Sequence, residues 1–330
     1  MYLPSTYAVT LCFMFITMLC WGSWANALKL CPGYRFQLFY WDYSIGLCVG
    51  AVSWGLTLGS SGTGEHFIQA LAHSPHYHLV FALLGGAIFN VANLFLVAAI
   101  DVAGLAVAFP VGIGLALVVG AVSNYLITPA GNPWLLFGGI ALVTGAILLD
   151  AAAYRRREQK RGSGGKGLFL SVLAGLLMGA FYPLVSKALF TKNSPGPYVV
   201  SFLFAIGVFL CALPLNYIIM RRPLDGQRPV TFSSYASAPK HFHLWGILGG
   251  IVWCTGATLN FVAAEGRAVG PAVAYSLGQG ATMVSAAWGV FIWKEFKGSQ
   301  RSVHTLLTLM CLFFLLGLGA IGLSPVWRTL

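Results

Sequence analysis

The sequence contains very little charge. Only 8% of its 330 residues are Asp, Glu, Lys or Arg and 58% are hydrophobic, whereas a soluble domain usually carries about 25% charged residues. Such a chain has too little polar surface to face water on all sides, so it needs lipid as its solvent. Ten hydrophobic runs approach the length of about 20 residues that crosses a bilayer. They lie near 5–28, 36–59, 79–100, 103–127, 133–153, 167–190, 197–220, 243–264, 268–293 and 303–323.

Other features are also missing. The runs lack the alternation of barrel strands, so we predict an all-α polytopic membrane protein. The seven cysteines show no CxxC pattern or matched spacing, and we therefore expect no disulfide, metal site or cofactor. The first run has neither a basic flank nor a cleavage cue, which favours a retained helix over a signal peptide. The net charge of +11 is attributed to membrane orientation, not to a nucleic-acid partner.

The lysines and arginines are unevenly distributed. If the ten runs alternate in direction, one membrane face receives fifteen of the 19 Lys and Arg residues and the other face receives four. The positive-inside rule assigns the richer face to the cytoplasm. We therefore predict that both termini lie outside, on the periplasmic or extracellular side, which requires an even number of helices.

The chain repeats itself. Ala106–Gly114 reads AVAFPVGIG and Ala272–Gly280 reads AVAYSLGQG; Asp101 recurs as Glu265, and two further glycine-containing phrases recur in the same order. We infer two five-helix repeats, 1–153 and 167–330, joined by a basic cytoplasmic linker at 154–166. Because five is odd, the second copy is inverted. Inverted halves are a transporter architecture that binds substrate near the membrane midplane, where the halves meet.

The repeated phrase also carries packing signals. Small residues let helices approach closely in lipid, so Gly112, Gly114, Gly278 and Gly280 should lie at crowded crossings. Prolines loosen a helix locally because they cannot donate to the preceding turn. Two prolines fall within predicted spans, and each is a candidate hinge or a static kink: Pro110 and Pro183.

Uncharged polar and aromatic side chains recur near the middle of several predicted helices. Gln279 is an example, and an unpaired amide at that depth is costly. A hydrogen bond to a neighbouring helix would satisfy each such group, and so would contact with a ligand. Their similar depth favours one shared cavity, with these candidate binding residues: Asn90, Asn93, Trp253, Asn260, Tyr275 and Gln279.

The first two predicted helices contain further candidates. Trp21 and Trp24 share a helix face, and Asn26 points roughly opposite Trp24. Of the eight carboxylates, we place only Asp42 inside a span. An ionisable group there is a functional hypothesis by default, and we predict a proton-coupling role for it. The alternative is a structural anchor paired with Lys29 or Arg35.

The sequence of the first two predicted helices also resembles that of known transporters. CWGSWAN followed by RFQLFYWDYSIG, with ten spans and a basic central loop, resembles bacterial sugar permeases of the glucose/ribose porter type. It also resembles plant ureide permeases; both groups belong to the drug/metabolite transporter superfamily. The resemblance implies proton-linked uptake of a small polar solute across the bacterial inner membrane. It implies these candidate residues: Trp21, Trp24, Asn26, Tyr40, Trp41 and Asp42.

The identity of the solute is constrained by what the spans lack. None contains an arginine, which disfavours a phosphate-bearing substrate. The remaining Trp, Tyr, Asn, Gln and Thr suit a neutral solute with flat or C–H faces. We favour a monosaccharide such as ribose or glucose, with a ureide, nucleobase or nucleoside as the alternative. No span pairs an acid with a base or a nucleophile with a base, which disfavours an enzyme. The expected partners are the solute, a coupling proton or sodium ion, and the bilayer.

Overall fold

The structure, a computed structural model, describes residues 1–62, 65–157, 165–224, 226–266 and 268–327. Within these residues every regular element is a helix, and no strand occurs. The elements are α1 (Tyr7–Ser23), α2 (Asn26–Lys29), α3 (Phe36–Leu56), η1 (Leu58–Ser60), α4 (Phe67–Ala72), α5 (His76–Ala103), α6 (Leu105–Ile127), α7 (Pro133–Arg157), α8 (Gly165–Phe190), α9 (Pro197–Arg221), α10 (Phe232–Ala236), α11 (Lys240–Glu265), α12 (Pro271–Gly278), α13 (Ala281–Ala287), η2 (Trp288–Ile292) and α14 (Arg301–Leu323).

Nine helical segments in the described part of the chain are long and apolar enough to cross a membrane. They correspond to nine of the ten predicted runs, so the all-helical polytopic class is confirmed. The predicted run 268–293 forms no single long helix and consists of α12, α13 and the π-helical turn η2. Most of the predicted linker, residues 158–164, lies outside the described residues.

The interrupted segment nevertheless passes from one end of the bundle to the other. It starts beside Ala130, which a Cβ atom on Gly270 would strike. It finishes next to Glu295, whose carboxylate accepts hydrogen bonds from Lys29 at 2.6 Å and Tyr154 at 3.1 Å. We call the second end, where α2 ends and α3 and α11 begin, the basic end.

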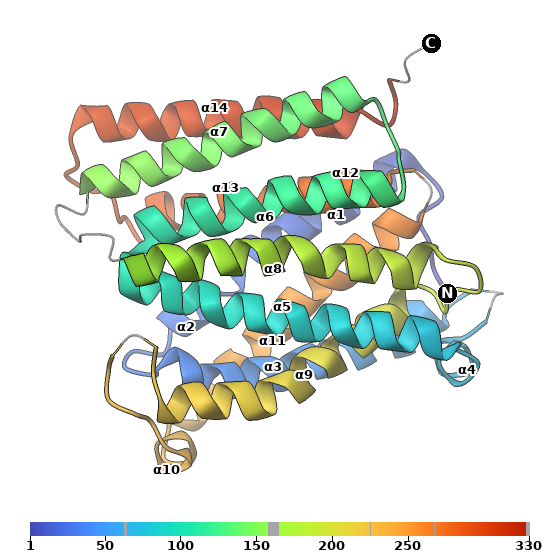
Figure 1. Cartoon of the computed structure of the whole chain (residues 1–330), viewed down its shortest axis with the longest axis horizontal. Helices are drawn as coiled ribbons and strands as arrows, with labels where there is room; N and C mark the ends of the chain where they lie inside the picture. The colour runs from blue at the N-terminus through green and yellow to red at the C-terminus, as the bar shows by residue number, and fades with distance from the viewer. Residues whose placement is uncertain (63–64, 158–164, 225, 267, 328–330) are drawn as a thin grey trace.

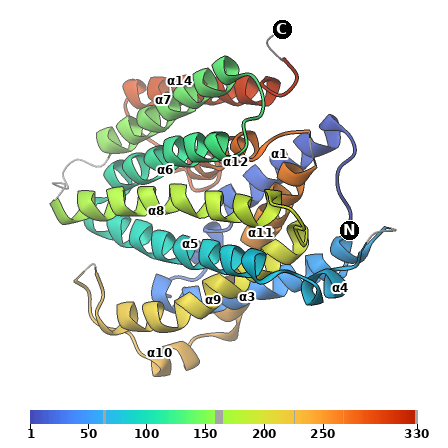
Figure 2. The ribbon, with the colours of Figure 1, turned by 45° about the vertical axis from the view of Figure 1, so that its right-hand side comes forward.

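Both ends of the described chain meet at the opposite end of the bundle, which we call the termini end. The Tyr2 amide donates to the Leu58 carbonyl at 2.9 Å, and the Asn132 amide donates to the Ser324 carbonyl at 2.7 Å. The Tyr7 hydroxyl donates to the Gly322 carbonyl. Figures 1 and 2 show the start of α1, the end of α14 and α4 all on this side of the bundle. Which membrane face this end occupies stays a prediction.

Each long helix packs against particular neighbours. α3 packs on α11, α5 on α9, α1 on α11, and α5 and α6 on α8. α7 and α14 pair with each other at one edge, and α3 and α9 form the opposite edge, with α10 beyond them (Figures 1 and 2). The central positions of α5, α8 and α11 place their mid-helix side chains next to one another.

Two helix pairs touch backbone to backbone at glycines. A Cβ atom on Gly250 of α11 would overlap the Tyr43 carbonyl of α3, and one on Gly46 would overlap the Ile247 carbonyl. Gly86 of α5 and Gly207 of α9 are blocked in the same way by each other's helix. Only residues without a side chain permit this approach, which supplies the packing that lipid-embedded helices need.

The repeated phrase gives a mixed result. Gly112, Gly278 and Gly280 are crowded, as predicted, whereas the nearest atom to a Cβ on Gly114 is 4.0 Å away. The prediction for Gly114 is therefore wrong, because a Cβ atom there would fit beside Ile147 at an ordinary contact distance. Pro110 and Pro183 lie inside α6 and α8, and both helices continue through them. The interruption falls instead in the copy that has no proline, at Gly278–Gly280.

Candidate functional site

A cavity of about 390 Å³ opens among the central helices. We call it the central cavity. On α5 its lining extends from Phe89, near the middle of the helix, to Asp101, close to the basic end. Its lining residues are Trp21, Gly22, Trp24, Ala25, Leu28, Phe36, Phe89, Asn93, Leu96, Val97, Ile100, Asp101, Phe109, Ile113, Met178, Phe181, Trp253, Gly278, Gln279, Ala281, Thr282 and Ser285.

Aromatic rings form the deep part of the central cavity. Trp21 and Trp253 stack with centroids 5.6 Å apart and planes inclined by 20°, and the Trp21 indole N–H donates to the Trp253 carbonyl at 3.3 Å. Phe89 packs on Trp253 at 4.4 Å, and Trp24 packs on Tyr43 at 4.7 Å. Three of the predicted binding residues, Trp21, Trp24 and Trp253, therefore contribute flat apolar faces to the cavity wall.

The interrupted segment brings Gln279 to the same wall. The amides of Gln279, Gly280 and Thr282 each donate to the carbonyl three residues earlier, at 3.2, 2.9 and 3.1 Å. This tight turn separates α12 from α13, because the two flanking glycines have low helix propensity. Gln279, Thr282 and Ser285 line the cavity as a result.

The same turn changes the position of Tyr275. A continuous helix would have placed Tyr275 on the face of Gln279, but the Tyr275 side chain is fully buried outside the cavity lining. Its hydroxyl donates to the Ala116 carbonyl at 3.1 Å and to the Met178 carbonyl at 3.3 Å. The structure therefore does not bring Tyr275 to the cavity.

Asn93 is the one member of a buried hydrogen-bonded chain of three residues that reaches the cavity. It lines the cavity, and its amide donates to the Tyr40 hydroxyl at 3.4 Å. Tyr40 in turn donates to the amide oxygen of Asn90 at 2.9 Å. Tyr40 and Asn90 are fully buried behind the wall, so of these three predicted residues only Asn93 reaches the cavity.

Three other predicted binding residues make structural contacts elsewhere. Asn260 donates to the Ala274 carbonyl at 3.0 Å and accepts from the Tyr182 hydroxyl. Asn26 donates to the carbonyl of Ser23, the last residue of α1, at 3.1 Å and accepts from the Trp293 indole at 2.6 Å. Trp41 lies against Met220 of α9. None of the three lines the central cavity, because each is held by other parts of the protein.

Asp42 lies in a closed cluster at the basic end. It is 2% exposed and accepts hydrogen bonds from Tyr34 at 2.9 Å, Tyr235 at 2.5 Å and His243 at 3.0 Å. Gly246 makes room for it, since a Cβ there would collide with the Asp42 side chain. Burial, with the nearby carboxylate, raises the pKa of Tyr34 and of Tyr235 well above the ordinary tyrosine value. Both hydroxyls therefore remain donors at physiological pH.

The alternative proposed for Asp42, an ion pair with Lys29 or Arg35, does not match this arrangement. Lys29 pairs with Glu295 at 2.6 Å, and Arg35 donates to the Arg228 carbonyl. The carboxylate of Asp42 is held by two phenols and an imidazole. Tyr235 comes from α10, in a loop 193 residues away along the chain.

Sequence reasoning missed Asp101. It lines the central cavity from the last turn of α5. The aromatic lining residues Phe36, Phe89 and Phe181 were also missed, because phenylalanine in an apolar run carries no distinctive signal. The match between Asp101 and Glu265 in the repeat was the available signal.

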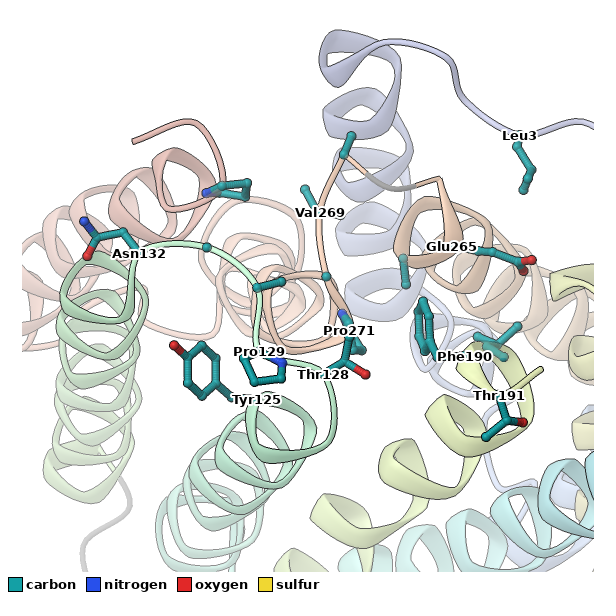
Figure 3. A pocket seen from close by; sticks show the side chains of 17 residues that line it. Leu3, Tyr125, Thr128, Pro129, Asn132, Phe190, Thr191, Glu265, Val269 and Pro271 are labelled. Atoms are coloured by element: carbon teal, nitrogen blue, oxygen red, sulfur yellow. The ribbon is translucent and has the colours of Figure 1, made fainter. Parts of the chain in front are cut away.

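A second pocket, of about 850 Å³, opens at the termini end (Figure 3). We call it the terminal pocket. Its walls are the ends of α6, α8 and α11 and the start of α12, and Glu265 lines it on the same side as Leu3. The lining comprises Leu3, Tyr125, Thr128, Pro129, Ala130, Gly131, Asn132, Leu189, Phe190, Thr191, Ala264, Glu265, Ala268, Val269, Gly270, Pro271 and Pro325.

Metal-ligating residues do not gather in the part of the chain that is described. Among those residues, no three His, Cys, Asp or Glu side chains are placed to hold an ion. All seven cysteines are unpaired thiols. The polar chemistry of the two pockets thus comes from amides, hydroxyls and the single carboxylates Asp101 and Glu265.

Comparison with known proteins identifies a family. The family model described as ureide permease matches residues 39–163 and 162–323. Ureide permease 2 of Arabidopsis thaliana is 25% identical, with 99% of this chain and 100% of that protein covered. Ureide permease 1 of the same plant is 24% identical with the same coverage.

A probable ureide permease A3 of Vigna unguiculata is 22% identical over 88% of this chain and 96% of its own. One solved crystal structure, described only as that of a protein, covers 95% of this chain and 96% of its own with a TM-score of 0.64. At 18% identity, that likeness shows the fold alone. These matches support the ureide permease side of the resemblance and not the sugar permease side. The chain is a multi-pass membrane transporter that belongs to the ureide permease family.

Proposed function

We propose that this transporter carries a small, neutral, flat solute containing a urea group, that is, a ureide or a related heterocycle. The observation that carries the proposal is the central cavity, in which indole faces stand beside the uncharged amides of Asn93 and Gln279. The family match supports the same class. The monosaccharide that we favoured from the sequence receives no such support, and the alternative takes its place.

The chemistry of the lining suits a urea group. An amide side chain offers a carbonyl acceptor and N–H donors, which complement the N–H groups and carbonyl of a urea. The stacked indoles of Trp21 and Trp253 offer an apolar surface to a planar ring. No lysine or arginine lines the described cavity, so an anionic solute would find no cationic partner there.

We also propose alternating access in a bundle built from two inverted five-helix halves. The helix pairing supports it: α3 against α11 corresponds to α9 against α5, and α1 against α11 corresponds to α8 against α5. The glycine contacts follow the same relation, with Gly46 and Gly250 matched by Gly207 and Gly86. Pro110 and Pro183 are proposed as points at which α6 and α8 bend during the cycle.

Proton coupling is proposed through Asp42. The cluster of Asp42 with Tyr34, Tyr235 and His243 joins the first half of the chain to the second at the basic end. Protonation there would weaken hydrogen bonds that hold this end together. By the positive-inside rule, we propose that the basic end faces the cytoplasm, with both termini outside a plasma or bacterial inner membrane.

The proposed substrate class can be tested by ligand-induced stabilisation. A ligand that binds only the folded state raises the melting temperature, so purified protein is melted with allantoin, uracil, ribose and glucose. We expect allantoin to raise the melting temperature and to compete in a liposome uptake assay. Trp253→Ala should remove this stabilisation, whereas Trp134→Ala, at an 83% exposed tryptophan outside the cavity, should preserve it. Stabilisation by sugars alone would overturn the proposal.

A further inference from the structure

The terminal pocket contains a carboxylate with an unsatisfied oxygen. Glu265 ends α11 and lines the pocket, where Figure 3 shows its side chain between Leu3 and Phe190. Its Oε2 atom is buried and has no hydrogen-bond partner. A buried acceptor without a donor is costly, and the cost is greater for a charged group. Because Glu265 as a whole is partly exposed and lines the pocket, a rotation of its carboxylate would bring this oxygen to a donor supplied by a solute.

Asp101 occupies the corresponding place at the other end of the bundle. Asp101 is the third residue from the end of α5, and Glu265 is the last residue of α11; the two are 164 positions apart in the repeated pattern. Asp101 lines the central cavity close to the basic end, and Glu265 lines the terminal pocket. Each pocket thus has one acidic side chain, contributed by an equivalent helix end.

The two pockets are separated by a buried barrier. Tyr182 donates to Asn260, and Asn260 donates to the Ala274 carbonyl at 3.0 Å. The Tyr182 and Tyr275 rings pack with centroids 5.0 Å apart. On α8, α11 and α12, these residues lie between those that line the central cavity and those that line the terminal pocket. A solute that reaches the termini end would pass this barrier and meet Glu265.

We propose that Glu265 is a second substrate-binding group, which accepts the N–H groups of a urea-containing solute in the terminal pocket. This inference rests on the function proposed above. An ionised carboxylate has two oxygens that can accept two parallel N–H donors, and a urea group presents such a pair. By the repeat relation, the same role is proposed for Asp101, which lines the central cavity near the basic end. The two acids would then bind the same solute at opposite ends of the bundle.

The experiment measures transport from each side separately. Uptake of allantoin is followed in right-side-out and in inverted membrane vesicles for the wild type, Glu265→Gln and Asp101→Asn. Loss of a charged hydrogen-bond acceptor should raise KM about tenfold. For Glu265→Gln the rise should occur from one side only, and for Asp101→Asn it should occur from the other side.

Two further variants separate binding from folding. Glu265→Asp keeps the charge and should restore part of the affinity. Glu65→Gln changes an exposed acid at the same end, outside the terminal pocket, and should leave KM unchanged from both sides. Melting of each purified variant shows whether it folds.

Several results would overturn the inference. Equal changes from both sides, or none in Glu265→Gln, would exclude a binding role for Glu265 while leaving the proposed function intact. A change confined to the pH dependence, with KM constant, would make Glu265 a proton site instead. Failure of the wild type to transport or bind allantoin would overturn the proposed function and this inference with it.

Discussion

The central cavity and the terminal pocket use equivalent helix ends but differ in depth. Around the central cavity, Trp24, Asn93 and Gln279 line open space. Beneath the terminal pocket, Tyr182, Asn260 and Tyr275 are fully buried and hydrogen-bonded to one another or to neighbouring backbone. The helix arrangement is equivalent in the two regions, but the side-chain pairing is not. Paired side chains close the bundle beneath the terminal pocket, whereas the lining residues leave the central cavity open.

Both regions lie within the same framework of helices, which the glycine contacts hold together. The largest predicted effect is a substitution at one of these contacts. Gly250→Leu would drive a side chain into the Tyr43 carbonyl, where backbone cannot yield. We expect a loss of more than about 4 kcal/mol of stability, seen as failure to elute as a monodisperse species. Gly86→Leu, at the equivalent contact of α5 with α9, should be equally severe. Gly114→Ala is the control, and normal folding of Gly250→Leu would contradict the proposed contact.

The second prediction concerns the cluster at the basic end. Asp42→Asn keeps the shape of the side chain but removes the charge that Tyr34, Tyr235 and His243 share. We expect uptake into liposomes to lose its response to an imposed pH gradient, while counterflow exchange of labelled solute continues. Ser53→Ala, an exposed change on the same helix, is the control. An unchanged pH response in Asp42→Asn would remove this residue from the coupling mechanism.

The third prediction contrasts two asparagines of the same chemistry in the two regions. Asn260→Ala leaves the Tyr182 hydroxyl buried without its partner, which should cost about 1–3 kcal/mol of stability. Asn93→Ala removes an amide from the cavity wall, and we expect a smaller loss of stability but weaker solute binding. Thermal melting with and without allantoin measures both effects. Equal stability losses would remove the distinction drawn between the two regions.

The smallest effect is expected at the ion pair between Lys29 and Glu295. The Lys29 side chain is 46% exposed. The pair connects the end of α2 to Glu295, which follows η2 in the chain. Partly exposed pairs contribute about 0–1 kcal/mol, so Lys29→Ala should change the melting temperature only slightly, and less in high salt. A large loss would show that ionic contact, more than aromatic packing, holds the basic end in its present form.

Much of the fold was predictable because hydrophobic length and glycine spacing are local signals. The nine long helices begin and end close to the predicted runs, and Gly46, Gly86, Gly207 and Gly250 all occur in the repeated phrases. The interruption at Gln279 was not predicted, since a run of apolar residues does not reveal where helical hydrogen bonding tightens to a shorter turn.

The candidate site was predictable only in part. Five predicted binding residues, Trp21, Trp24, Asn93, Trp253 and Gln279, line the central cavity. The others face neighbouring helices, because helical spacing fixes which residues share a face but not which helix that face meets. The partners of Asp42 illustrate the limit: Tyr235 and His243 are about two hundred positions distant in sequence.

The glycine contacts of α3 with α11 and of α5 with α9 have a mechanical consequence. Helices pressed together along their main chains cannot slide or separate without losing their tightest packing, so each pair should move as one rigid unit. Spin labels placed on both helices of one pair should report a single, invariant separation throughout the cycle. Labels placed on helices of the two different pairs should report a separation that shifts when solute is added.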